Sequence, residues 1–154
     1  NLTNPQESNK ENTQETNKAD REDDQWIGTI EIPAIDIKYK ISKKLTVANL
    51  DTSIVMLYPN DATKLNKPGN VVLIGHNYRD GRFFSNNDKL KNGDKIYITD
   101  KDGDKITYKI YKSYITDNSD AEYMIRNTNG KREISLSTCT DDTKNRLIIL
   151  AREV

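Results

Sequence analysis

One cysteine, one histidine and one arginine stand at the ends of three predicted strands. Cys139 closes the run REISLSTC, His76 follows the run VVLIG, and Arg146 opens the run RLIIL. A thiolate is a nucleophile, and an imidazole serves as its ion-pair partner or as a proton shuttle. A guanidinium can donate hydrogen bonds to a carbonyl or to a developing oxyanion. These three residue types are therefore the right ones for acyl transfer.

The same residues also have ordinary structural interpretations. The chain holds no other cysteine and no other histidine. A lone cysteine is more often a small buried hydrophobic residue than a nucleophile, and a lone histidine is more often a surface or capping residue than a base. One cysteine excludes an internal disulfide, and one cysteine with one histidine cannot complete a structural zinc site. Residue types alone leave the catalytic and the structural interpretations open.

The spacing of the last two predicted strands indicates where the cysteine and the arginine lie. In REISLSTC, Ile134 and Leu136 share one face by the period of two, and the cysteine shares the other face with two serines. If the two apolar residues fill the core, Cys139 points outward at the end of its strand. The connection over residues 140–145 consists of six polar residues. If the two strands form an antiparallel hairpin, Cys139 and Arg146 face each other where the loop leaves the strands. His76 closes its own strand after Gly75, which permits a bend or a close approach of the backbone.

The elements that must position these residues are mostly strands. Apolar runs, many of them alternating, predict strands in IGTIEIP, AIDIKYKI, NVVLIGH, DKIYITD, DKITYKIYKSYI, REISLSTC and NRLIILARE. The turn signals KPGN, KNGD and KDGDK separate them. Only TVANLD and RFFSNNDKL are predicted to form short helices or turns. Seven or eight short strands in about 130 residues favour an all-β closed barrel or a sandwich.

Length and charge limit the class of protein. The 154 residues are enough for one compact domain with a core. Lysine and arginine number 24 and are balanced by 24 acidic residues, and no basic block stands out, which argues against nucleic-acid binding. No apolar run is long enough to span a membrane, and no signal peptide is visible. Because the chain begins with asparagine rather than methionine, we expect that an upstream segment has been removed.

Residues 1–25 differ in composition from the remainder. They contain only two hydrophobic residues, Leu2 and Ala19, among seven acidic and three basic residues. Such a segment cannot bury enough apolar surface to offset the entropy lost on ordering. We expect a disordered linker or stalk over residues 1–25, with a charged functional tail as the alternative, and one folded domain over residues 26–154.

Three motifs in this domain resemble those of the sortases, cysteine transpeptidases of Gram-positive cell surfaces. IGTIEIPAIDIKYKI resembles the opening strands of the family. KPGNVVLIGHNYRDGRFFSNNDKLKNGDKIYI resembles its central signature, with a Gly-Asn lead, an apolar strand, Gly-His, an aromatic pair, and a leucine before a Gly-Asp turn. ISLSTCTDDTKNRLIILARE resembles its catalytic Thr-Cys strand, loop and Arg-led final strand. The resemblance covers residues 26–154 and implies an eight-stranded barrel with a groove over the catalytic strands.

The resemblance implies catalytic roles for three residues. Cys139 matches the family's nucleophile, His76 its general acid and base, and Arg146 the arginine that stabilises the substrate and the oxyanion. Arg152 is the competing arginine, but it lies six residues further along the last strand, where sortases do not place the catalytic one.

Three further residues are candidates for substrate binding. Thr138 occupies the position of a near-invariant threonine that shapes the pocket of the family. Ser137 lies beside it on the same strand, and Tyr78, close to the histidine, is expected to line the groove.

The implied reaction has two steps. Cys139 attacks the Thr–Gly bond of an LPXTG-like sorting signal and forms a thioacyl enzyme, which an amine of a peptidoglycan precursor (lipid II) or a pilin lysine then resolves. His76 protonates the leaving amine and deprotonates the incoming one. Sortases usually hang from the membrane by an N-terminal helix, which fits the polar segment 1–25. We therefore expect a location on the outer face of the cell membrane.

The subclass and two other functions stay open. LSTCT resembles class B, but the short spacing between His76 and Cys139 leaves little room for the extra helix that class B sortases carry before the last strand. A compact class A or class D type fits this spacing better, and the Asp-Pro-aromatic lid of class C is missing. The alternatives to a sortase are a thiol hydrolase or protease that passes the acyl group to water, and a non-catalytic surface-binding domain.

Calcium needs separate consideration. In TDKDGDK, Asp100, Asp102 and Asp104 mimic the start of an EF-hand loop, but the bidentate glutamate expected at its end is Tyr111 instead. A hairpin turn between two strands is the better interpretation. The loop before the histidine offers only Asp61 as a carboxylate. We predict no metal dependence and no cofactor.

Overall fold

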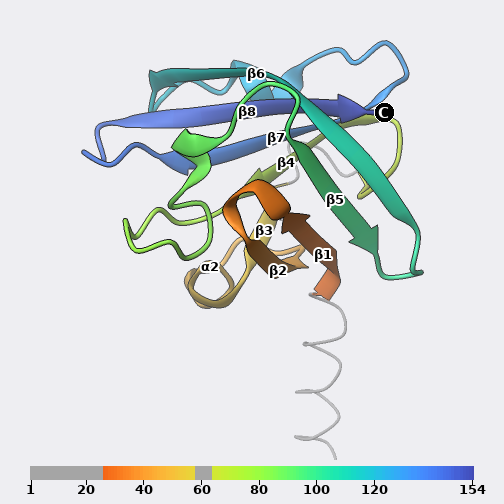
Figure 1. The fold of residues 1–154 in the computed structure, drawn as a ribbon, viewed down its shortest axis with the longest axis horizontal. Coiled ribbons are helices and arrows are strands. Elements are labelled where there is room, and N and C mark those ends of the chain that lie inside the picture. Colours follow the sequence, from red (N-terminus) through yellow and green to blue (C-terminus); the bar gives the residue numbers. More distant parts are fainter. Residues whose placement is uncertain (1–25, 58–63) are drawn as a thin grey trace, which may run out of the picture.

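The computed structural model describes residues 26–57 and 64–154, and these residues form a closed eight-stranded barrel (Figure 1). The predicted linker over residues 1–25 and Asp61 lie outside the described residues. The predicted all-β barrel is confirmed, and the sandwich alternative is wrong. The strands are β1 (Trp26–Ile32), β2 (Ile37–Ser42), β3 (Ile54–Leu57), β4 (Gly69–Ile74), β5 (Lys95–Asp100), β6 (Lys105–Asp117), β7 (Arg132–Cys139) and β8 (Asn145–Glu153), and the helices are α2 (Val47–Thr52) with the 3-10 helices η1 (Pro33–Ile35), η2 (Asn87–Lys89) and η3 (Glu122–Ile125).

The strand order around the barrel is β1-β2-β3-β4-β7-β8-β6-β5. The pairs β1–β2, β5–β6 and β7–β8 are antiparallel hairpins. The pairs β2–β3 and β4–β7 are parallel. β7 therefore lies between a parallel neighbour from the middle of the chain and an antiparallel neighbour from its end, as Figure 1 shows.

Two elements differ from the sequence prediction. The sequence did not predict β3, because Ile54, Val55 and Met56 form a short run without alternation, and all three are fully buried. β2 begins later than predicted, because Pro33 starts the 3-10 helix η1 and Asp36 then adopts a left-handed φ of 52°. The predicted helices or turns in TVANLD and RFFSNNDKL are present as α2 and η2.

The barrel interior is filled by the apolar face of every strand. Ile30, Ile41, Leu73, Ile98 and Leu136 are fully buried members of this inner core. Their alternation along the strands produces the pattern from which the strands were predicted.

A second, smaller core lies on the outer face of β4, β7 and β8. Tyr123 of η3 packs there with Val72, Ile148 and Leu150. Because this segment covers the strands, β7 is buried on both faces from Glu133 to Thr138. The outer face of β7, which carries Ser135 and Ser137, is thus buried under η3, and only the end of this face at Cys139 is partly exposed.

The acidic turn between β5 and β6 is a hairpin turn, as predicted. The N–H of Asp100 donates to the carbonyl of Asp104 at 2.9 Å, and the N–H groups of Asp102 and Asp104 both donate to Oδ1 of Asp100 at 3.0 Å. The Asp100 carboxylate thus stabilises its own turn. Over residues 26–57 and 64–154, no three His, Cys, Asp or Glu side chains gather in a way that could hold a metal ion. In the same ranges, no helix has the length and apolar character needed to cross a membrane.

Candidate active site

The register of β7 with its two neighbours brings the three predicted catalytic residues to one edge of the barrel. Cys139 lies directly opposite Arg146 in the antiparallel pair β7–β8, as the loop length predicted. In the parallel pair β4–β7, Ile74 lies opposite Ser137. His76 and Cys139 each follow two residues further on, so the same register leads to the histidine beside the cysteine.

The chain beyond β4 stays bonded to β7. The N–H of Gly75 donates to the carbonyl of Ser137 at 3.2 Å, and Oγ1 of Thr138 donates to the carbonyl of Gly75 at 2.7 Å. Nδ2 of Asn77 donates to the carbonyl of Cys139 at 3.0 Å. These bonds flank the histidine on both sides, so its backbone is fixed relative to the cysteine strand.

The three side chains belong to the outer face of the barrel. Residues two apart on a strand share a face. Ile74 and Ile148 pack in the outer core, and they lie two residues from His76 and Arg146 respectively. Cys139 shares the face of its directly paired partner, Arg146. Cys139 and Arg146 therefore share one face at the ends of their strands, and His76 follows β4 at the same edge of the barrel.

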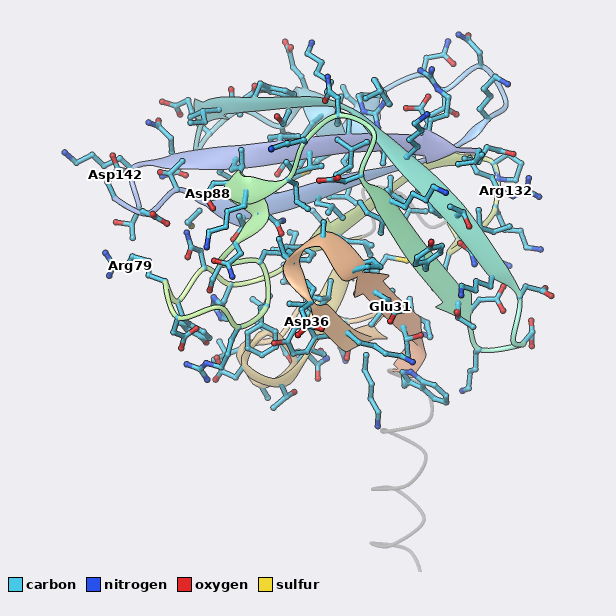
Figure 2. All side chains as sticks on the ribbon, in the orientation of Figure 1. Glu31, Asp36, Arg79, Asp88, Arg132 and Asp142 are labelled. Carbon is cyan, nitrogen blue, oxygen red and sulfur yellow. The ribbon has the colours of Figure 1, made fainter. Side chains whose placement is uncertain are left out.

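Two further contacts join the loops that follow His76 and Cys139. Nδ2 of Asn77 also donates to Oδ1 of Asp141 at 2.8 Å, and Nη1 of Arg79 donates to the carbonyl of Asp141 at 3.0 Å. Figure 2 shows Arg79, Asp88 and Asp142 at the same end of the barrel, with Arg132 at the other end. The sequence did not predict these contacts of Asn77 and Arg79 with Asp141, because the residues lie far apart in the chain.

Cys139 is accessible to a substrate. Its thiol is free and only partly buried. A cavity of about 170 Å³ reaches it, with walls that include Phe84, Ile115, Leu147 and Asp141. This setting differs from that of a cysteine that serves as a small core residue.

Arg146 and Arg152 have different surroundings. Nη1 of Arg146 lies 3.4 Å from Oγ of Ser137, near Cys139. Arg152 lies at the opposite end of β8, where Nε donates to Oε2 of Glu133 at 3.1 Å and the guanidinium stacks 4.5 Å from the ring of Tyr111. Arg152 therefore belongs to a structural network away from the cysteine, which agrees with the choice of Arg146.

The hydroxyls of Thr138 and Ser137 face protein groups. Both residues are buried, and Thr138 bonds to the carbonyl of Gly75 as described above. Oγ of Ser137 lies 3.2 Å from the hydroxyl of Tyr123 and accepts from Arg146. The two hydroxyls thus hold neighbouring groups in place, and Thr138 also lines the cavity that reaches Cys139. A role of Thr138 and Ser137 in substrate binding stays a prediction.

Tyr78 lies against the histidine. Its ring centroid is 4.7 Å from that of His76, with an interplanar angle of 33°, and 37% of the residue is exposed. The hydroxyl donates to Oδ1 of Asp51 at 3.2 Å. Desolvation and this hydrogen bond raise the pKa of Tyr78, and the guanidinium of Arg82, 4.6 Å from the ring, partly opposes the rise.

Asp51 is a site residue that the sequence analysis missed. Its Oδ1 lies 3.5 Å from Nε2 of His76. It is in α2, and the predicted helix TVANLD gave no sign that it would face the histidine, because the contact depends on tertiary packing.

Gly75, which precedes His76 in the chain, lies where the packing leaves no room for a side chain. A Cβ at this position would lie 2.6 Å from Cδ1 of Ile54 and 2.7 Å from Cδ2 of Phe84. We expect Gly75→Ala to lower the free energy of unfolding by about 1–3 kcal/mol, because the packed core must shift to admit the methyl group. Urea unfolding measures this change.

The control for this substitution is Gly130→Asn. No atom lies within 4 Å of a Cβ at Gly130, and asparagine tolerates its φ of +80°. We expect that variant to lose less stability than Gly75→Ala, because its backbone is strained but no atom clashes with the new side chain. Equal stability of Gly75→Ala and the wild type would contradict the tight approach at Gly75.

The fold and the site together define a closed β-barrel with a cysteine, a histidine and an arginine at one edge. The sequence profile of the Sortase domain matches residues 30–154. The chain belongs to the sortase family.

Known relatives agree with this assignment. Sortase A of Bacillus anthracis is 30% identical over 128 residues, which are 81% of this chain and 58% of that protein. Sortase A of Listeria monocytogenes is also 30% identical, over 82% of this chain and 54% of that protein. The structure of a Clostridium perfringens Sortase D5 transpeptidase has a TM-score of 0.74 at 28% identity, covering 84% of this chain and 79% of that chain. This chain thus spans a little more than half the length of the curated relatives it matches.

Proposed function

We propose that this domain is a cysteine transpeptidase in which Cys139 is the nucleophile, His76 the general acid and base, and Arg146 the group that stabilises the oxyanion. The main support is the register of β7, with Arg146 opposite Cys139 and His76 following β4 in the same alignment. Membership of the sortase family supports the same reaction class.

The first step forms a thioester. Sγ of Cys139 bonds to the carbonyl carbon of the threonine in an LPXTG-like sorting signal, and the Thr–Gly C–N bond breaks. His76 gives a proton to the departing amine. The guanidinium of Arg146 donates hydrogen bonds to the carbonyl oxygen as negative charge develops there.

The second step releases the product. An amine attacks the thioester carbon, the C–S bond breaks, and the thiolate of Cys139 is restored. His76 takes the proton that the attacking amine loses. The reaction therefore needs no external oxidant or reductant, and a new amide bond replaces the one that was cut.

Membership of the sortase family supports a general class of substrate and a general location. Sortases act at the Gram-positive cell surface on surface proteins and cell-wall precursors, and we propose the same setting for this domain. An LPXTG-like signal as donor and a peptidoglycan precursor amine as acceptor are the specific candidates, with a pilin lysine as the other acceptor. The compact spacing of His76 and Cys139 favours a class A or class D type, and the N-terminal membrane anchor stays a prediction.

Intact mass spectrometry with a panel of LPXTG-like peptides tests the proposed reaction. We expect an acyl adduct on the protein, and its conversion to a ligated peptide when a glycine-based or lysine-based amine is added. A peptide with the same residues in scrambled order serves as the control. Release of the adduct by water alone at every amine concentration would favour the hydrolase, and an unmodified protein with the whole panel would contradict the proposed activity.

A further inference from the structure

A carboxylate and a phenol meet beside the imidazole of His76. Oδ1 of Asp51 lies 3.5 Å from Nε2 of His76 and accepts the hydroxyl of Tyr78 at 3.2 Å. The Tyr78 ring packs against the imidazole at 4.7 Å between centroids. The three side chains thus form a closed cluster in which each contacts the other two.

The elements that carry Asp51 and Tyr78 are themselves fixed. The helix α2, which carries Asp51, is capped by Thr46, whose Oγ1 accepts the N–H of Asn49 at 3.1 Å. The N–H of Tyr78 donates to Oγ of Ser85 at 3.0 Å. The imidazole therefore contacts two side chains that are held in place by different parts of the chain.

The contact with Asp51 distinguishes the two imidazole nitrogens. A carboxylate next to Nε2 favours the tautomer with its proton on Nε2 and limits rotation of the ring. Nδ1 is then the nitrogen that is free to accept a proton from the thiol or from an amine, and to return it. Such an arrangement prepares the ring for proton transfer before the substrate binds.

We propose that Asp51, together with Tyr78, is a positioning residue for His76 that sets the tautomer and the orientation of its imidazole. This inference rests on the proposed function, because the tautomer matters only where His76 transfers protons. The effect is moderate, since 37% of the His76 side chain and 55% of the Asp51 side chain are exposed and water competes for both.

Nitrogen-15 NMR can report the tautomer directly, because His76 is the only histidine in the chain. Protein labelled with nitrogen-15 histidine gives the signals of a single imidazole, and long-range proton–nitrogen correlations identify which nitrogen carries the proton. We expect the wild type to hold its proton on Nε2 at a pH where the ring is neutral. In Asp51→Asn, we expect the signals to move toward an average of the two tautomers.

Asp36→Asn is the matched control for this substitution. It removes the same charge from an exposed aspartate, and asparagine suits the left-handed φ of 52° at this position. No hydrogen bond or ion pair joins Asp36 to His76 in the described part of the chain. We expect its imidazole signals to match those of the wild type.

Activity provides the second measurement. We expect kcat of Asp51→Asn to fall by about tenfold, with the KM for the peptide changed much less, because orientation of the proton-transfer group is lost rather than binding. Tyr78→Phe, which keeps the ring contact and loses only the hydroxyl, is expected to show a smaller fall. Asp36→Asn is expected to keep the wild-type kcat.

The two measurements separate this inference from the proposed function. Unchanged imidazole signals in Asp51→Asn would overturn the inference, whatever happens to the rate. A changed tautomer with an unchanged kcat would overturn it as well, because the ring would not need positioning. If the wild type forms no adduct with any peptide, the proposed function fails, and the NMR result alone still decides whether Asp51 sets the tautomer.

Discussion

Replacing Cys139 with alanine is expected to abolish both the acyl adduct and the ligated product. The chain has no second thiol that could take over the attack, and His76 and Arg146 cannot form a thioester. Removing the nucleophile of a covalent mechanism lowers kcat on the order of 10⁴-fold or more. Mass spectrometry and a ligation assay, performed side by side, measure the two losses.

The loss must be chemical rather than structural for this test to be decisive. The hydrogen bonds around Cys139 use its backbone, since Asn77 donates to its carbonyl and β8 pairs with its strand. The sulfur is partly exposed, so we expect Cys139→Ala to keep its free energy of unfolding within about 1 kcal/mol of the wild type. A variant that is folded and still ligates peptides would contradict the proposed nucleophile.

Replacing Glu133 with alanine is expected to cause the largest loss of stability among the changes considered. Glu133 is 3% exposed and lies between Arg126 and Arg152, at 2.8 Å and 3.1 Å. Removing its carboxylate leaves Arg126, whose side chain is only 17% exposed, as an uncompensated charge. Breaking a buried ion pair from one side costs about 3–5 kcal/mol. Urea unfolding at neutral pH measures the expected change.

The surroundings of Glu133 explain why the effect is large. Arg126 donates from Nη1 to Tyr111 at 2.9 Å and from Nη2 to Asn70 and Ser135, at 2.8 Å and 2.9 Å. The cluster joins the end of η3 to β4, β6 and β7. Its loss would release the segment that covers the outer core, in addition to leaving a charge unpaired.

An exposed pair provides the comparison. Arg82 and Asp80 form an ion pair at 2.7 Å, but their side chains are 61% and 41% exposed. We expect Asp80→Ala to lower the free energy of unfolding much less than Glu133→Ala does, because water screens the exposed pair. If Asp80→Ala and Glu133→Ala lowered the free energy of unfolding by similar amounts, the larger contribution expected of the buried network would be contradicted.

The stabilising effect of Glu133 should also depend on pH. Burial opposes its ionisation, but hydrogen bonds from Tyr111, Arg126 and Arg152 outweigh that cost and hold the pKa of Glu133 below its ordinary value. The contribution of the carboxylate is therefore complete above about pH 4.3, the ordinary value for glutamate. It is lost as the pH falls through the lower folded-state value. We expect the stability gap between the wild type and Glu133→Gln to narrow at acidic pH.

The sequence was most informative where residues are close along the chain or follow a strand period. The loop over residues 140–145 was short enough to predict that Cys139 faces Arg146, and alternation assigned Leu136 to the core. Gly75 was recognised as a place where the backbone bends or approaches closely, and the packing against Ile54 shows that close approach is the reason.

Features that depend on packing between distant segments were not predicted. The polar face of β7 was expected to point outward, but η3 covers it, and a strand pattern contains no information about such a cover. Asp51 was missed for the same reason, because only the folded barrel brings α2 to His76. The strand β3 was missed because it is buried on both faces and therefore lacks alternation.

The parallel pairing of β4 with β7 also affects when the proposed catalytic residues come together. The last hairpin of the chain, β7–β8, completes the barrel between β4 and β6. Joining segments so distant in sequence requires a large loop to close, which is entropically costly and slow. Because synthesis proceeds from the N-terminus, the nascent domain contains His76 long before its partner strand exists. Cys139 gains its neighbour Arg146 only when the C-terminal strand β8 has been made. Under the proposed mechanism, an incomplete polypeptide therefore lacks the assembled site.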